Sequence, residues 1–265
     1  MIQLAFPVAG RSYPKNEQPV HFYLNRVSER SIHLFVPRVR PQNRLPELIA
    51  VATKLFARRG FQLVTMRDVS TELGLSVGVL YQAVESKEAL FDLVVRHGLG
   101  LEPADTPLPP MPVPTPAPGV TIKHLERLID KVSSWPVLDA ALATTEGAGA
   151  TEFRAIAGET FDRMSEYRVA LQVLAKSAHD WPELAAVLLS GLRARFLDAM
   201  TRYLRSRVEC GAFTLAADPS LCAVVILETL ASWSFHRFGD PFYQYLPESD
   251  LRTAVIEMLV ASVGA

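Results

Sequence analysis

TMRDVSTELGLSVGVLYQAVESKEAL, residues 65–90, contains three successive helix starts. Thr65 and Asp68 have the spacing of a capping box, in which two side chains satisfy free backbone amides at a helix start. Gly74 suits a tight turn because glycine readily adopts a positive φ angle. Ser76 and Ser86 occupy positions where a hydroxyl begins a helix. These signals predict short helices over residues 65–73, 77–84 and 87–97.

The letters GLSVG, residues 74–78, also match the G-x-S-x-G pattern of a hydrolase nucleophile elbow. That elbow needs a strand entering the serine and a helix leaving it, because the strained turn exposes the hydroxyl. Here a capped helix precedes Ser76, and no histidine stands in a pattern typical of a catalytic base. We therefore predict a helix start at Ser76, no catalytic residue, and a protein that is not an enzyme.

A further helix is marked just before this stretch. Pro46 suits a first helical position, and Gly60 suits the residue at which the helix stops. The preceding segment VPRVRPQNR, residues 36–44, combines prolines with three arginines and is typical of a basic arm. We predict a compact helical module over 36–98, preceded at 1–35 by an extension of uncertain order.

Charge is distributed unevenly along the 265 residues, whose net charge is −1. Residues 36–98 hold nine Lys and Arg against six Asp and Glu, whereas 99–265 hold 14 against 20. Only the first segment suits a polyanion. The two cysteines are too few for a disulfide framework or a zinc site, which fits the reducing cytoplasm. No apolar run is long enough for a membrane span, and no metal or cofactor is expected.

Residues 99–119 separate the module from the remainder, and eight prolines in 101–119 exclude a helix there. We interpret this segment as a linker or a long surface loop. The remainder, 120–265, has apolar residues at helical spacing throughout. Its predicted helices cover residues 120–134, 137–145, 152–178, 182–208, 218–238 and 250–262. No strand pattern is found, so the predicted class is all-α, a helix-turn-helix three-helix domain followed by a C-terminal helical bundle.

Residues 45–94 resemble the N-terminal domain of the TetR/AcrR-type transcriptional regulators. The matching residues are Ala52, Phe56, Gly60, Phe61, Thr65, Val69, Leu73, Gly74, Leu75, Ser76, Gly78, Leu80, Tyr81, Ser86, Lys87, Glu88, Ala89 and Leu90. The match is spread over the whole module and is more specific than GLSVG alone. The C-terminal part is similar to the family only in architecture.

The resemblance implies a role for each matching position of the helix-turn-helix. Thr65, Arg67, Tyr81 and Lys87 would bind phosphates or position the reading helix, and Ser76 would start it. Val77, Gly78, Val79 and Gln82 would face the bases. The family usually has a polar residue at position 79 and often Tyr or His at 83, whereas this chain has Val79 and Ala83. Apolar contact with a thymine methyl group suits both residues.

For the C-terminal part, the resemblance implies a small-molecule pocket and a homodimer. The candidate pocket residues are Phe153, Met164, Tyr167, Trp181, Phe196, Trp233 and His236. Aromatic residues at helical spacing are also the ordinary interior of a bundle, so the core interpretation stays open for each. The strongly apolar segment 220–238 would pair with 250–262 across the dimer, with the centre of a monomeric bundle as the alternative.

The sequence therefore predicts a cytoplasmic, nucleoid-associated DNA-binding regulator. It would be a homodimeric repressor that binds a palindromic operator in double-stranded DNA and is released by a small-molecule effector. The alternative is a helical ligand-binding protein or enzyme whose helix-turn-helix domain has weak or lost DNA affinity. Val79, Ala83 and the modest charge of the module favour this alternative.

Overall fold

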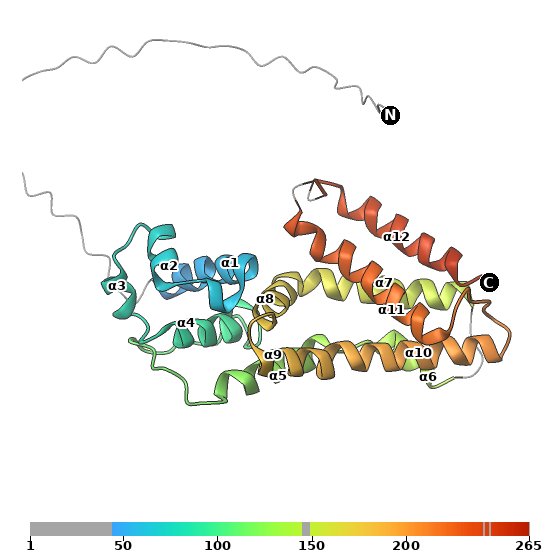
Figure 1. Cartoon of the computed structure of the whole chain (residues 1–265), viewed down its shortest axis with the longest axis horizontal. Helices are drawn as coiled ribbons and strands as arrows, with labels where there is room; N and C mark the ends of the chain where they lie inside the picture. The colour runs from blue at the N-terminus through green and yellow to red at the C-terminus, as the bar shows by residue number, and fades with distance from the viewer. Residues whose placement is uncertain (1–43, 145–148, 241, 244, 265) are drawn as a thin grey trace, which may run out of the picture. The chain divides into compact units, whose positions relative to one another are not determined.

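The computed structural model describes residues 44–144, 149–240, 242–243 and 245–264. These residues fold into helices (Figure 1), and within them the only β-type pairing is an isolated bridge between Val84 and Val113. The predicted all-α class is confirmed. The extension 1–35 and residues 36–43 of the basic arm lie outside the described residues.

The head, which we define as residues 44–98, follows the predicted order of helices. It consists of α1 (Leu45–Leu63), α2 (Met66–Glu72), α3 (Val77–Tyr81), α4 (Lys87–Leu93) and the π-helical turn η2 (Val94–Gly98). Gly60 interrupts α1 with φ 76°, where the sequence predicts the helix stop. The reading helix α3 is shorter than predicted: it ends at Tyr81, not at residue 84.

Residues 101–119 run back onto the head, and we call this segment the strap. The Val113 N–H donates to the Ala83 carbonyl at 2.8 Å, and the Glu85 N–H donates to the Val113 carbonyl at 2.9 Å. The Thr115 N–H donates to the Glu85 carboxylate at 2.9 Å, and its hydroxyl donates to the Ser86 hydroxyl at 2.8 Å. The predicted surface loop is thus attached to the connection between α3 and α4, and Val113 is buried.

After the strap, ten helical segments follow in the described residues. They are α5 (Val120–Val132), α6 (Pro136–Leu142), α7 (Ala150–Glu166), α8 (Arg168–Ala178), α9 (Pro182–Val187), η3 (Leu188–Arg193), α10 (Ala194–Glu209), α11 (Pro219–Ser234), η4 (His236–Gly239) and α12 (Glu248–Ser262). The predicted helix 152–178 is two helices, because α7 packs on α11 and α12 while α8 packs on α1. No Gly or Pro marks the break at Tyr167. The predicted helix 218–238 ends at Ser234.

Two hydrophobic core clusters hold these helices together. The first combines the head with α5, α8 and α9, and the second combines α6, α7, α10, α11 and α12. The first cluster crosses the predicted boundary between the head and the C-terminal part. Apolar side chains buried across that boundary remove their surface from water, so the head is packed directly against the bundle.

The backbones of head and bundle approach each other closely at Gly60. A Cβ atom placed on Gly60 would lie 2.6 Å from the carbonyl oxygen of Lys176, at the end of α8. The next residue, Phe61, donates its N–H to the Ser177 hydroxyl at 3.1 Å. The Trp181 ring lies against Phe61, with 5.2 Å between ring centroids. Glycine at 60 therefore permits the contact by which α8 fixes the head.

Candidate DNA-binding surface and ligand cavity

The start of α2 forms the predicted capping box. The Asp68 N–H donates to the Thr65 hydroxyl at 3.2 Å, and the Thr65 N–H donates to the Asp68 carboxylate at 2.8 Å. Hydrogen bonds from Thr65, with the nearby Arg59 guanidinium at 3.0 Å, lower the pKa of Asp68 to about 2. The carboxylate is therefore charged at neutral pH and stabilises the start of α2.

The turn between α2 and α3 has the geometry expected of a helix-turn-helix. Gly74 adopts φ 63°, and Leu75 donates its N–H to the Ser70 carbonyl at 2.9 Å. Leu80 and Val84 are buried. Ser76 is the N-cap residue of α3, but its hydroxyl makes no capping hydrogen bond, so the predicted hydroxyl cap is wrong. The element before Ser76 is helix α2 and not a strand, so Ser76 does not lie in a nucleophile elbow.

The predicted DNA-contacting side chains form the outer face of this motif. Thr65, Arg67, Ser76, Gly78, Tyr81 and Gln82 are exposed, and Val77 and Val79 are partly exposed. Ala83 is only 8% exposed, and its carbonyl accepts the strap hydrogen bond, so its predicted outward position is wrong. Because Ala83 faces the core, a small residue there reflects packing against the strap.

Lys87 has a role inside the head that the sequence does not indicate. Its ammonium group donates to the Phe61 carbonyl at 3.0 Å and to the Gln62 carbonyl at 3.4 Å, and lies 4.3 Å from the centroid of the Phe61 ring. These carbonyls follow the break at Gly60, where a helix end leaves acceptors unpaired. Burial lowers the pKa of Lys87. An ammonium group has three N–H donors, so one remains for a phosphate.

Replacement of Lys87 by alanine is expected to change both stability and DNA binding. Loss of charged hydrogen bonds to the α1 carbonyls lowers the free energy of unfolding by about 1 kcal/mol. Loss of one phosphate contact lowers the slope of log affinity against log salt by about 1. Lys54→Ala is the matched control, because Lys54 is an exposed lysine of α1. Chemical unfolding and DNA titrations at several salt concentrations measure the two effects. A Lys87→Ala protein with unchanged salt slope would restrict Lys87 to its structural role.

A cavity lies in the bundle, where the two core clusters meet. It is formed by α5, α7, α8, η3, α10 and α11, and its volume including the mouth is about 820 Å³. Most of the wall is apolar, with Trp135, Leu171, Phe196, Leu227 and Phe235 among the lining residues. A predominantly apolar small molecule fits such a wall.

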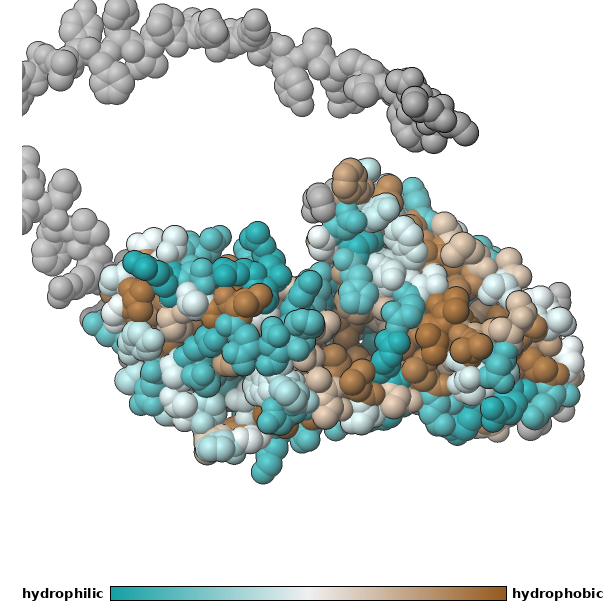
Figure 2. All heavy atoms as spheres, in the orientation of Figure 1, coloured by the Kyte–Doolittle hydropathy of each residue, from teal (hydrophilic) through white to brown (hydrophobic). Residues whose placement is uncertain are grey.

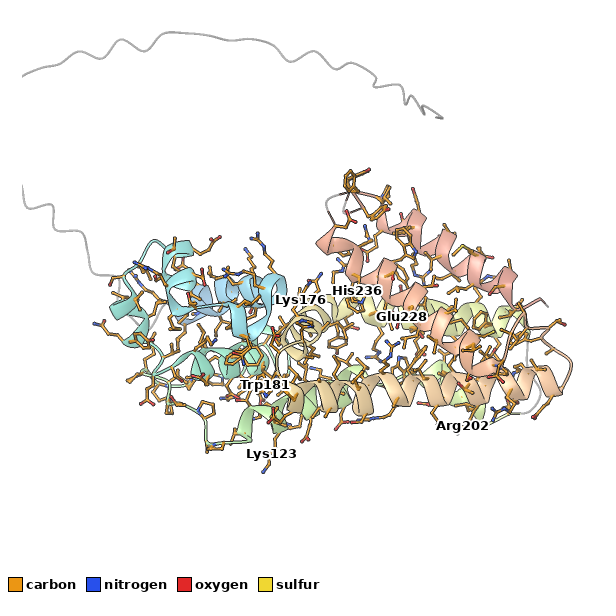
Figure 3. All side chains as sticks on the ribbon, viewed as in Figure 1. Lys123, Lys176, Trp181, Arg202, Glu228 and His236 are labelled. Carbon is orange, nitrogen blue, oxygen red and sulfur yellow. The ribbon has the colours of Figure 1, made fainter. Side chains whose placement is uncertain are left out.

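Three of the seven predicted pocket residues line this cavity, namely Met164, Phe196 and His236. The other four lie elsewhere. Phe153 is fully buried beside Tyr203 and Phe213 in the second core cluster. Tyr167 lies at the α7–α8 break, and Trp233 packs on Tyr243. Trp181 packs on Phe61 at the head, away from His236 (Figure 3). Helical spacing alone does not separate these core positions from wall positions.

Four polar side chains interrupt the apolar wall: Arg163, Arg193, Glu228 and His236. Arg193 and Glu228 form an ion pair at 2.5 Å. His236 lies directly after α11 (Figure 3), and burial is the main cause that lowers its pKa, which favours the neutral ring. Its ring stacks near Phe235, at 4.0 Å between centroids. Only His236 was predicted; the charged residues look like ordinary surface residues of amphipathic helices in the sequence.

Among the residues that the structure describes, no group of three or more His, Cys, Asp and Glu side chains is placed to hold a metal ion. No helix in the same set combines the length and hydropathy needed to cross a membrane.

The architecture and this surface define a class: a helix-turn-helix head packed on a helical bundle that contains a cavity. Residues 48–94 match the family model described as bacterial regulatory proteins, tetR family. The head of this chain is therefore similar in sequence to the N-terminal region of that family.

Two curated proteins match the head in sequence. The HTH-type transcriptional repressor KstR2 of Rhodococcus jostii is 40% identical over 53 residues, which are 20% of this chain and 26% of that protein. The uncharacterized HTH-type transcriptional regulator YfiR of Bacillus subtilis is 36% identical over 64 residues, 24% of this chain and 31% of that protein. The sequence match thus spans about a quarter to a third of the length of these relatives.

A solved structure extends the similarity to the bundle. The ketosteroid transcriptional regulator KstR2 of Mycobacterium tuberculosis aligns with a TM-score of 0.51 over 84% of this chain and 95% of that chain, at 17% sequence identity. At this identity the alignment shows a shared fold for head and bundle.

Proposed function

We propose that the protein is a transcriptional regulator that binds a palindromic operator as a homodimer and acts as a repressor. The observation that carries this proposal is the helix-turn-helix face with exposed Tyr81 and Gln82 on α3. The unpaired guanidinium of Arg67, which has no ion pair or hydrogen bond to its side chain among the described residues, lies on α2 beside it. A short helix with such a face fits the major groove, and the arginine suits a phosphate.

Two further observations support repression and the release of the protein from DNA by an effector. One curated relative of the head is named a repressor. The cavity offers a binding site for an effector, and its wall includes α8, the helix that contacts Gly60 of the head. Occupation of the cavity would shift α8 and so change the separation of two heads on DNA. The protein would then act in the cytoplasm at the nucleoid, without a cofactor and without enzymatic activity.

The homodimer is supported by apolar side chains on the outer side of α11 and α12. Leu221 and Val225, four residues apart on α11, are 60% and 62% exposed, and Met258 on α12 is 58% exposed. Figure 2 shows hydrophobic residues gathered over α11 on the face in view. Exposed apolar area of this kind marks an interaction surface. A second copy pairing α11 and α12 of each protomer would cover it.

Gln82→Ala and Arg67→Ala are expected to change DNA binding in different ways. Without the Gln82 amide, which can hydrogen-bond a base edge, preference among operator variants is expected to shift by about 1–3 kcal/mol at one base pair. Arg67→Ala removes a phosphate contact, so affinity falls almost equally on all sequences and the salt slope falls by about 1. Competition titrations with single-base operator variants measure both. If the two substitutions had the same effect on every variant, α3 would not read bases through Gln82.

A further inference from the structure

The side chains that line the cavity carry more positive than negative charge. Arg193 is neutralised by Glu228 at 2.5 Å. Arg163, on α7, also lines the cavity, and within the described part of the chain its side chain makes no hydrogen bond or ion pair. The adjacent acid Asp162 is held by Arg252 through two hydrogen bonds of 2.6 and 2.7 Å. One uncompensated positive charge therefore borders an apolar cavity.

Neighbouring groups do not supply the missing negative charge. Glu159, one turn before Arg163, accepts the Val137 N–H at 3.0 Å and forms no ion pair with Arg163. The His236 ring is a neutral or cationic group and supplies no negative charge; partial desolvation lowers its pKa. Lys176, whose charge acts on His236, adds a second positive group near the cavity (Figure 3). A guanidinium beside an apolar wall is stabilised by an anion that forms charge-assisted, paired hydrogen bonds.

We infer that the effector of the cavity is an amphipathic carboxylate, with an apolar body against Phe196, Leu227 and Phe235 and its carboxylate on Arg163. This inference rests on the proposed function, because it names the ligand class of the same cavity. The apolar body supplies most of the binding free energy through burial. The carboxylate supplies selectivity, because a neutral analogue leaves Arg163 unpaired and a cationic analogue is repelled.

Isothermal titration calorimetry with decanoate, methyl decanoate and decyltrimethylammonium, each below its micelle concentration, tests the inference. The wild-type protein is expected to bind decanoate about tenfold more tightly than methyl decanoate and to bind the cation most weakly. Arg163→Gln is expected to remove the preference for decanoate and to leave binding of the ester unchanged. Arg202→Gln is the matched control, because Arg202 pairs with Asp198 on the exposed surface of α10 (Figure 3).

Two results would overturn the inferred ligand class. One is wild-type binding of the ester or the cation as tight as that of decanoate, and the other is a preference that survives in Arg163→Gln. Failure of hexanoate, decanoate and tetradecanoate all to bind would overturn it as well. DNA binding without any ligand is measured in parallel. A protein that binds an operator but shows no carboxylate preference keeps the proposed function and loses only this ligand class.

The strap supports a second, independent inference about the reading helix. Val113 and Thr115 bind the three residues Ala83, Glu85 and Ser86, which directly follow α3. The Ser86 hydroxyl also accepts the Ala89 N–H at 3.0 Å as the cap of α4. The geometry points to Val113 and Thr115 as positioning residues, which hold α3 at a fixed angle to α4 without contacting DNA.

Thr115→Val removes the hydroxyl bond to Ser86 at nearly constant volume, and Thr106→Val is the matched control within the strap. A loosened α3 is expected to lower the ratio of operator to nonspecific DNA affinity by about tenfold, while the salt slope stays constant because no phosphate contact is lost. Thr106→Val leaves the ratio unchanged. A Thr115→Val protein with the wild-type ratio would contradict the positioning role, whatever its melting temperature.

Discussion

Gly60→Ala is expected to lower the free energy of unfolding by about 3 kcal/mol. The substitution combines two costs, since the residue adopts φ 76° and a Cβ would lie 2.6 Å from the Lys176 carbonyl oxygen. A left-handed backbone costs a non-glycine residue roughly 1–2 kcal/mol, and overpacking costs roughly 1–3 kcal/mol. Backbone atoms of α8 must shift to relieve the contact, so the head is displaced together with α1. Urea unfolding and the melting temperature measure the loss.

Gly74→Ala separates the two costs. Gly74 also has a positive φ, 63°, but no atom lies within 4 Å of the Cβ position. Its replacement is expected to cost about 1 kcal/mol through the backbone alone. Equal destabilisation by Gly60→Ala and Gly74→Ala would mean that the head does not depend on close contact between Gly60 and α8.

Val225→Glu is expected to abolish the homodimer and to weaken operator binding by at least about 100-fold. The side chain is 62% exposed on α11, so the monomer tolerates a charge there, whereas a buried, unpaired carboxylate is costly in an apolar interface. A single head contacts one half-site, and its affinity approaches the nonspecific value. Sedimentation velocity gives the oligomeric state, and titration of a palindrome and of an isolated half-site gives the affinities.

Val208→Glu is the control for this substitution, because Val208 is 40% exposed on α10 and lies outside the two helices proposed to pair. It is expected to remain dimeric with unchanged operator affinity. Dissociation caused by Val208→Glu, or a Val225→Glu protein that stays dimeric, would place the interface elsewhere.

Local signals in the head allow its fold to be predicted. Capping at Thr65, the turn at Gly74 and the buried positions Leu80 and Val84 depend on residues close in sequence, so spacing is enough to identify them. The role of Lys87 could not be found in this way. Its acceptors are Phe61 and Gln62, and that contact exists only once α1 and α4 are packed together.

The strap and the cavity depend on contacts that are distant in sequence. Proline density predicts an extended segment, and Val113, between two prolines, has the backbone N–H that proline lacks and a β-branched side chain suited to edge pairing. Its partner at Ala83 is set by the tertiary fold. Likewise, Arg163 has no acidic partner next to it in the chain, because the adjacent Asp162 pairs with Arg252 on α12. That pairing is a contact between residues distant in sequence. The family resemblance implied a pocket in the bundle, but helical spacing did not indicate which aromatic residues form the cavity wall.

Selection of operators from random-sequence DNA tests the central claim most directly. The full chain is incubated with the DNA pool at moderate salt, and bound sequences are recovered and read over successive rounds. A homodimer with one α3 helix per half-site is expected to enrich a palindrome whose half-sites are separated by about one or more turns of DNA. The isolated Gln82→Ala change should alter the enriched bases within each half-site. Recovery of no palindromic sequence would contradict the assignment of the protein as a DNA-binding regulator.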